Sequence, residues 1–217
     1  MKISIIFTLL SIFIFSGCTT KNVVPPSKQK TVIKTKKSEF YTLKKELDYK
    51  FGIVEKKEES LADASLLESF RGCVFAKKLL ADIPKTLTKI HSLKSDFNDD
   101  DYLEKLKSVD DDYEKIKSNI TFSVKASNSS RDLEDVLYDA LERENLQISD
   151  GDYTNHLDII LSKKTKRDIT TVFITLKDTK GRVFTKNKVD ILSDDIAMRF
   201  YEKIKKEGLD RVLGLSL

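Results

Sequence analysis

The feature that most constrains the fold is a change in the spacing of apolar residues after Ser118. Before this point apolar side chains recur every three or four residues, which is the period of a helix that buries one face. After it they alternate with polar residues, as in Ile120-Thr121-Phe122-Ser123-Val124, which is the period of a half-buried strand. The chain is therefore expected to combine a helical part with a part that contains a sheet.

Residues 39–118 are predicted to form a helical hairpin or bundle. Apolar residues at helical spacing indicate one helix within 61–81, a second that begins near Pro84, and a third over 102–117. Pro84 suits the first turn of a helix, and the carboxylates of Asp99 to Asp101 suit the positive end of the third helix dipole. The segment 39–60 could start a further helix through Phe40, Leu43, Leu47 and Phe51.

Residues 119–217 are predicted to form an α+β module with the order strand, helix, three strands, helix. Alternation indicates strands at 120–124, 156–162, 169–176 and 183–191, and the run Asp178-Thr179-Lys180-Gly181 indicates a turn that makes the last two a hairpin. Polar clusters at 128–130 and 193–195 are suited to cap the two helices. Helices on one face of a small, mostly antiparallel sheet would bury every apolar stripe.

The first seventeen residues read as a secretory signal. Lys2 precedes an apolar run from Ile3 to Phe15, and the small residues Ser16 and Gly17 follow it. Thirteen residues are too few to cross a hydrocarbon core of roughly 30 Å as a helix, which favours cleavage over a permanent membrane span.

The residues Phe15-Ser16-Gly17-Cys18 resemble the lipobox of bacterial lipoproteins, although Phe15 stands where leucine is usual. The resemblance implies cleavage between Gly17 and Cys18 and lipid attachment at Cys18; the alternative is an ordinary signal peptide with an incidental cysteine. Two or three acyl chains would hold the protein stably on a membrane, because each buried methylene contributes roughly 0.8 kcal/mol. Cys73 would then have no intramolecular disulfide partner, and it is expected to be an isolated buried thiol.

Residues 18–38 are predicted to be a flexible basic tether, since 19–38 hold six lysines, no acid and the pair Pro25-Pro26. Removing these lysines and Lys2 from the 39 basic residues leaves 32 basic and 35 acidic residues in 39–217, a formal charge of −3. A nucleic-acid module would concentrate its basic residues on the folded part, so nucleic acid is not an expected partner. The tether lysines are suited to anionic lipid headgroups instead.

Several segments are similar to a family of small spirochaetal outer-membrane lipoproteins of about twenty kilodaltons. The likeness covers residues 61–205 and rests on five stretches, which are 83–87, 120–124, 133–144, 153–161 and 176–181. The chain departs from that family in lacking its N-terminal strand before the first helix. The resemblance implies an envelope lipoprotein without known enzymatic activity, and it supplies no functional residues.

Motifs for chemistry are absent from the sequence. No Gly-rich phosphate loop and no Cys or His pair at zinc spacing occur, so neither a cofactor nor a metal ion is expected, and the protein is predicted not to be an enzyme. A loop beginning at Asp96 fails the EF-hand pattern, which leaves a weak surface cation site near Asp99 to Asp101 as an alternative. An envelope hydrolase would need a deep cleft where groups such as Tyr153, His156 and Asp158 converge.

These observations predict an outer-membrane lipoprotein that contacts the membrane through its lipid anchor and binds another envelope protein in the periplasm, in an adaptor or structural role. Thr19 follows Cys18 in place of the aspartate that retains many lipoproteins on the inner membrane, which favours the outer membrane. The alternative is a surface-exposed lipoprotein that binds host or environmental macromolecules.

Overall fold

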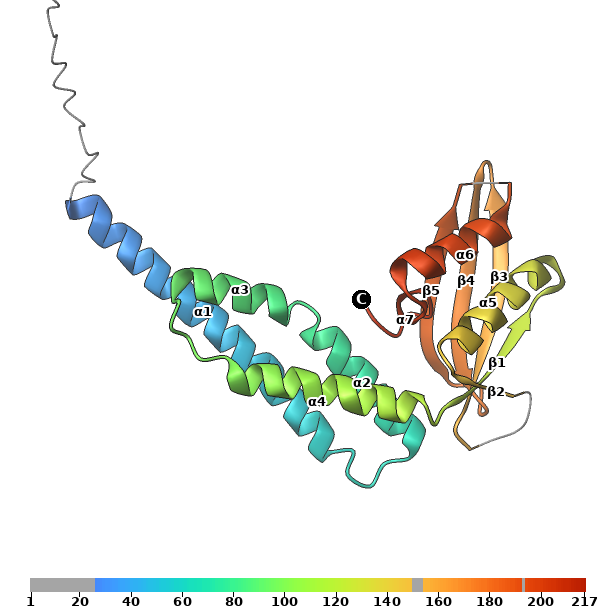
Figure 1. Ribbon diagram of the computed structural model, residues 1–217, viewed down its shortest axis with the longest axis horizontal. Coiled ribbons are helices and arrows are strands. Elements are labelled where there is room, and N and C mark those ends of the chain that lie inside the picture. The colour runs from blue at the N-terminus through green and yellow to red at the C-terminus, as the bar shows by residue number, and fades with distance from the viewer. Residues whose placement is uncertain (1–25, 150–153, 193) are drawn as a thin grey trace, which may run out of the picture.

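The computed structural model describes residues 26–149, 154–192 and 194–217, with side chains from residue 35 onward. Figure 1 shows an elongated molecule, in which a helical region at one end leads into a sheet with its own helices at the other. The helical region ends at Lys117 and the first strand begins at Thr121, where the spacing of apolar residues changes.

Four helices make up the helical region, and α1 is the longest of them. α2 begins with a capping box, in which the Ser65 hydroxyl accepts from the Glu68 backbone N–H while the Glu68 carboxylate accepts from Ser65 N–H. α1 packs against α2 and α3, and α2 packs against α4. The four helices are α1 (Pro26–Glu59), α2 (Leu66–Leu80), α3 (Ile83–Leu93) and α4 (Asp100–Lys117).

The sheet has five strands in the order β2-β1-β3-β4-β5. β1 is parallel to both of its neighbours, whereas β3 pairs antiparallel with β4, and β4 with β5. The α+β prediction is confirmed, and the sheet is mixed, because the parallel strands β1 and β2 are joined through a helix rather than a tight turn. The strands are β1 (Thr121–Ala126), β2 (Gln147–Ile148), β3 (His156–Lys166), β4 (Ile169–Asp178) and β5 (Val183–Ile191).

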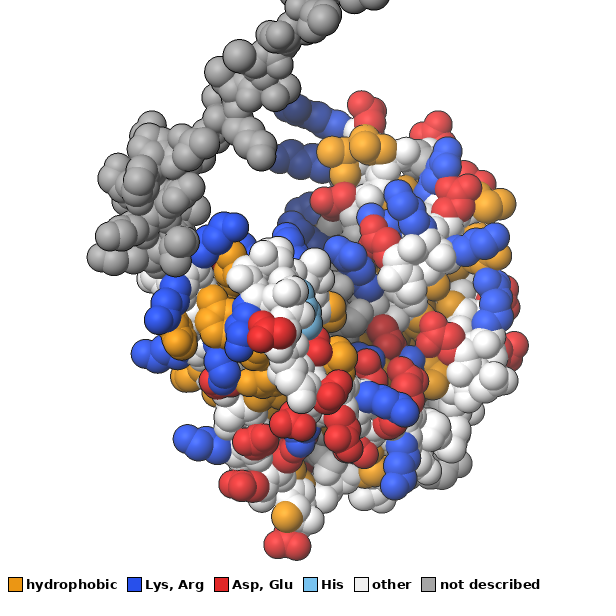
Figure 2. Space-filling view, turned by 60° about the vertical axis from the view of Figure 1, so that its left-hand side comes forward, with side chains coloured by type: hydrophobic (Ala, Val, Ile, Leu, Met, Phe, Trp, Pro, Cys, Tyr) orange, Lys and Arg blue, Asp and Glu red, His pale blue; other side chains and the backbone are white. Residues whose placement is uncertain are grey.

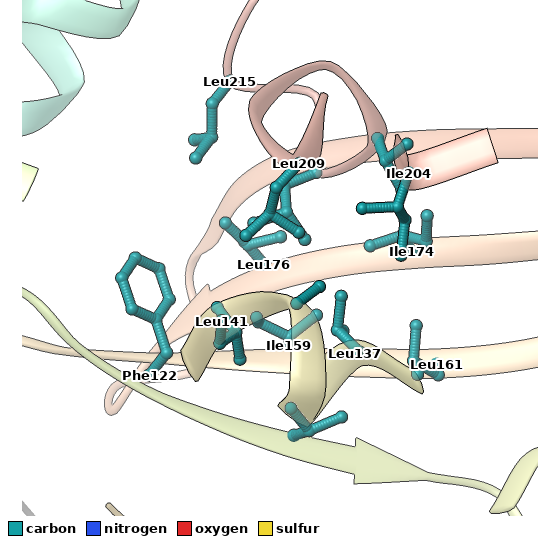
Figure 3. Packing of buried hydrophobic residues seen from close by; sticks show 14 of the residues in the cluster. Phe122, Leu137, Leu141, Ile159, Leu161, Ile174, Leu176, Ile204, Leu209 and Leu215 are labelled. Carbon is teal, nitrogen blue, oxygen red and sulfur yellow. The ribbon is translucent and has the colours of Figure 1, made fainter. Parts of the chain in front are cut away.

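Helices cover one face of the sheet. Figure 3 shows Leu137 and Leu141 of α5 and Ile204 of α6 packed over Ile159 of β3 and Ile174 of β4, all of them buried. The side chain of Asp195 caps α6 by accepting from Met198 N–H at 3.0 Å, as predicted from the polar cluster before this helix. The helical elements of the module are a 3-10 turn at Asn128–Ser130 and the helices α5 (Arg131–Arg143), α6 (Ile196–Glu207) and α7 (Leu209–Val212).

The apolar residues form two clusters. The larger cluster lies between the sheet and the helices that cover it, and it extends into the helical region through Phe70, Val74 and Tyr113. The smaller lies between the helices and includes Leu47, Phe51 and other buried residues of α1 to α4. The base of the helical region therefore shares a core with the sheet, while its far end depends on the smaller cluster.

Two predictions need correction. Residues 26–38 are helical rather than a flexible spacer, because α1 starts at Pro26, where proline suits a first helical turn, and continues through the lysines, which are good helix formers. The predicted order also lacks β2 and α7, which are too short to show a period. Within residues 26–149, 154–192 and 194–217, no helix is both long enough and apolar enough for a membrane crossing.

Candidate functional site

The predicted anchor residues, Gly17 and Cys18, lie outside the described residues. The first described element is α1, and only seven residues separate Cys18 from its start at Pro26. These seven residues can span at most about 25 Å when extended. A lipid on Cys18 would thus hold the start of α1 close to the membrane.

α1 is a long projection with a basic beginning. Its 34 residues correspond to about 51 Å of helix at 1.5 Å per residue. Figure 1 shows its N-terminal end extending beyond α3, and the exposed Lys36 and Lys37 lie in this part of the helix. The described residues that precede the bundle are therefore a rigid helical rod from Pro26 onward.

Acidic side chains gather on α4. Figure 2 brings this end of the molecule forward and shows Asp and Glu side chains in its lower middle, with Lys and Arg toward its upper and outer parts. Exposed aspartates of α4 include Asp100, Asp101, Asp110 and Asp111. The predicted acidic start of this helix is confirmed, since α4 begins at Asp100.

The alternative of a cation site near Asp99 to Asp101 gains no support. Asp99 Oδ2 lies 2.9 Å from His91 Nε2, so this carboxylate already has a partner. Among the residues that the structure describes, no group of three or more His, Cys, Asp or Glu side chains is placed to hold a metal ion.

His156 and Asp158 do come together, as the hydrolase alternative requires, and neighbouring β1 adds Ser123 and Lys125. Asp158 Oδ1 accepts from Ser123 Oγ at 2.7 Å and lies 3.1 Å from His156 Nε2, and Asp158 Oδ2 pairs with Lys125 Nζ at 2.7 Å. Burial by itself would raise the pKa of Asp158, but hydrogen bonds from Lys125, Ser123 and His156 leave this pKa below its ordinary value. Tyr153, the third residue of the hypothesis, lies outside the described residues.

This cluster differs from a Ser-His-Asp triad in two ways. In a triad the histidine uses one ring nitrogen for the serine and the other for the carboxylate, whereas here Ser123 Oγ and Asp158 Oδ1 both lie near His156 Nε2. His156 Nδ1 is buried and has no hydrogen-bond partner among the described residues. Ser123 is fully buried, so its hydroxyl does not face a substrate. The geometry is that of a polar network that joins β1 to β3.

Cys73 is half-buried, and it is the free thiol in the described part of the chain. Burial, together with the carboxylates of Asp112 and Glu58, raises the pKa of this thiol to about 11. A thiol with such a pKa stays protonated near neutral pH, and only the thiolate is a good nucleophile. The cysteine is therefore suited to packing rather than to covalent chemistry.

A buried ionic cluster joins the helical region to the module. Lys117, at the end of α4, donates to Asp210 Oδ1 at 2.6 Å and to Glu144 Oε2 at 3.0 Å, and its side chain is only 4% exposed. Burial alone would lower the pKa of Lys117, but the two carboxylates outweigh it and raise this pKa. The ammonium group stays charged and links α4 to the C-terminal end of α5 and to the first turn of α7.

Two surface depressions are broad and open to solvent. One, of about 650 Å³, is lined by the connection from α1 to α2 and by Arg71 and Phe75 of α2. The other, of about 590 Å³, lies beside β5 and is lined by Lys78, Lys186 and Lys188 among others. His156 and Asp158 line neither depression, so the deep cleft that the hydrolase alternative needs is not formed there.

No protein-family model matches this chain, and no curated protein matches it. Six chains of solved structures do match. One is described as a minor lipoprotein from Acinetobacter baumannii; it is 14% identical, the match covers 43% of this chain and 86% of that chain, and the TM-score is 0.22. The similarity to this lipoprotein is weak.

Proposed function

We propose that this protein is a lipid-anchored component of a bacterial envelope, with acyl chains on Cys18 and a folded part that binds another envelope component without catalysing a reaction. The N-terminal sequence carries the proposal, because a charged start, a short apolar run and Phe15-Ser16-Gly17-Cys18 occur together. The outer membrane, on its periplasmic face, is the favoured site, and a relation to the small spirochaetal lipoproteins is part of the proposal.

Helix α1 would set the distance between the lipid anchor and the sheet module. A rod of about 51 Å on a link of at most about 25 Å would hold the sheet module away from the membrane at a height set by the tilt of the rod. The lysines of residues 19–38 would lie near the lipid headgroups, where each contributes up to about 1 kcal/mol if the leaflet is anionic. Such a spacer suits a protein that meets a partner at a fixed distance from the membrane.

A Cys18→Ala variant tests the anchor in cells that process lipoproteins. We expect the variant to lose lipid labelling and to leave the membrane fraction or to accumulate with its signal uncut. The matched control is Cys73→Ala, which removes the other cysteine and should stay lipidated and membrane-bound. A Cys18→Ala protein that is cut normally and remains on the membrane would refute the proposal.

Proteinase treatment of intact cells separates the two orientations. A periplasmic adaptor should survive until the envelope is opened, whereas a surface-exposed protein that binds host or environmental macromolecules should be lost at once. Cross-linking in the cells, followed by identification of the trapped proteins, would then identify the partner.

A further inference from the structure

One face of the sheet is open. Residues of β4 alternate between buried and accessible positions, with Val172, Ile174 and Leu176 turned toward α5 and α6. The residues between them are turned the other way, and Phe173 at the centre of this face is 41% exposed. Figure 1 shows α5 and α6 on the covered side only.

This part of the chain is strongly basic. Residues 163–188 hold nine Lys and Arg and only two acidic residues, Asp168 and Asp178. Lys163 pairs with Asp132 of α5, and Arg182 pairs with the buried Asp178. Within the described residues, no ion pair involves the remaining seven, which are Lys164, Lys166, Arg167, Lys177, Lys180, Lys186 and Lys188.

The strand register arranges three of these lysines around a strip without charge. Thr175 lies between Ile160 and Lys186, Phe173 between Ser162 and Lys188, and Thr171 between Lys164 and Asp190. Neighbouring strands are about 5 Å apart and alternate residues of a strand about 7 Å apart, so these lysines are distributed over the face, and Lys186 and Lys188 also line the depression beside β5. Lys164, Lys186 and Lys188 are all exposed.

Apolar side chains extend the open face at the end remote from the helical region. Ile169 is 42% exposed and Leu192 is 74% exposed. Ile169 precedes Thr170 and Leu192 follows Ile191, and Thr170 pairs with Ile191 in antiparallel register, so Ile169 and Leu192 lie next to each other at the end of the sheet. Lysines beside exposed apolar side chains are the combination that peripheral proteins present to a lipid surface.

We propose that the open face of β3, β4 and β5 binds a membrane surface that carries anionic phosphate headgroups. The choice of a lipid surface rests on charge complementarity and on the apolar side chains, since the lysines have no ion-pair partner among the described residues and lie on the same face as Ile169, Phe173 and Leu192. A single anion bound in the depression beside β5, which Lys186 and Lys188 also line, would not account for Lys164 or for the exposed apolar side chains. This contact goes beyond the lipid anchor and does not require acylation of Cys18; on the anchored protein it would form when α1 is tilted far enough for the module to reach the membrane.

The test uses the unacylated chain from residue 19 onward, which keeps every described residue, with sedimentation on vesicles. We expect binding to vesicles that contain phosphatidylglycerol, little binding to pure phosphatidylcholine, and weakening as salt is raised. A Lys164→Gln, Lys186→Gln, Lys188→Gln variant should bind about 100-fold more weakly, because each lysine near an anionic surface contributes about fivefold.

A second triple variant controls for net charge. Lys85→Gln, Lys107→Gln, Lys115→Gln removes three exposed lysines of α3 and α4 for which no ion pair is found among the described residues, and it should bind within about threefold of the unchanged chain. Circular dichroism should show both variants folded.

Three results would overturn the proposal. The first is absence of binding to the anionic vesicles, and the second is equal weakening by the two triple variants. The third is tighter binding to a single-stranded oligonucleotide than to the vesicles, lost in the sheet variant, which would assign the face to nucleic acid. None of these results bears on lipid attachment, which the Cys18→Ala variant tests separately.

Discussion

The helical region and the sheet module bury their apolar residues to different extents. Among the described residues, the module core contains 24 buried residues and draws Phe70, Val74 and Tyr113 from α2 and α4, whereas the core of the helical region contains nine. The far end of the helices is therefore held by a small core, and the near end folds as part of the module. The helical region is therefore expected to be more stable next to the sheet module than at the end nearest the proposed anchor.

The two regions also use charge differently. The helical region carries ion pairs at its surface, such as Lys50 with Asp82 and Lys105 with Glu58, and pairs of this kind contribute at most about 1 kcal/mol each. At its junction with the module, Lys117 is buried between two carboxylates. The buried ion pairs at the junction are therefore expected to contribute more to the free energy of unfolding than the surface ion pairs along the helices.

The largest expected effect comes from the shared core. Phe122→Ala should lower the free energy of unfolding by about 4 kcal/mol, since this side chain of β1 is fully buried in the larger cluster. Leu47→Ala in the smaller core should cost about 3 kcal/mol. Urea unfolding followed by circular dichroism gives both values.

Hydrogen exchange distinguishes how far each change spreads. Phe122→Ala should speed exchange in the module and also around Phe70 and Tyr113, whereas Leu47→Ala should speed exchange mainly in α1 and α3. If Phe122→Ala leaves exchange around Phe70 unchanged, the two regions do not share a core.

The next largest effect on stability is expected at Lys117, where α4 joins the module. Asp210→Ala leaves Lys117 buried with only Glu144 as a partner, and loss of one member of a buried ion pair costs about 3 kcal/mol. Asp111→Ala, at an exposed position of α4, is the matched control and should change stability by less than about 0.5 kcal/mol. Equal stabilities of the two variants would contradict a structural role for the junction charge.

The turn between β4 and β5 gives a pH-dependent effect. The Asp178 carboxylate is 4% exposed and accepts hydrogen bonds from the backbone N–H groups of Lys180 and Arg182 and from Arg182 Nε. Burial would raise the pKa of Asp178, but these bonds hold it below its ordinary value. Its stabilisation is therefore fully present above pH 4 and is lost as the pH falls through the lower pKa of the folded state.

Asp178→Asn should accordingly cost about 2 kcal/mol at pH 7, the usual contribution of hydrogen bonds to a charged group. The difference from the unchanged chain should shrink as the pH falls below 4, because the unfolded chain then takes up a proton on this carboxyl group, and should be lost below the lowered pKa of the folded state. Urea unfolding at several pH values measures the difference, and a constant difference from pH 7 to pH 2 would contradict this assignment.

The smallest effect compares two glycines of the helical region. Gly52 lies within α1, and a Cβ added there would meet nothing within 4 Å, so Gly52→Ala should stabilise the protein by about 0.5 to 1 kcal/mol. Gly72 lies within α2 under the side chain of Leu61, which would have to move. Gly72→Ala should therefore stabilise less than Gly52→Ala or destabilise, and thermal unfolding that ranks them in the opposite order would contradict this packing.

The local spacing of apolar residues predicted most of the helices and strands. Alternation identified β1, β3, β4 and β5 because each has one buried face, and helical spacing identified α2 to α4, α5 and α6. The start of α1 was missed because a lysine-rich segment after two prolines resembles a linker, although lysine itself favours helix. β2 was missed because two residues show no period.

The sites depend on distant pairings that a single sequence does not reveal. Lys117 meets Glu144 and Asp210, which are 27 and 93 residues away. His156 and Asp158 could be grouped because they are close in sequence, but Ser123 joins them only through the parallel register of β1 with β3. The lysines of the open face do follow a period-two pattern, and they become one surface only once the strand order is known.

Mass spectrometry of the mature protein purified from membranes tests the central claim, the lipid anchor, most directly. We expect an N-terminal peptide that begins at Cys18 and carries a diacylglyceryl group on its sulfur, with or without a further acyl chain on the new amino group. An N-terminal peptide that begins elsewhere, or that begins at Cys18 with a free thiol, would contradict it.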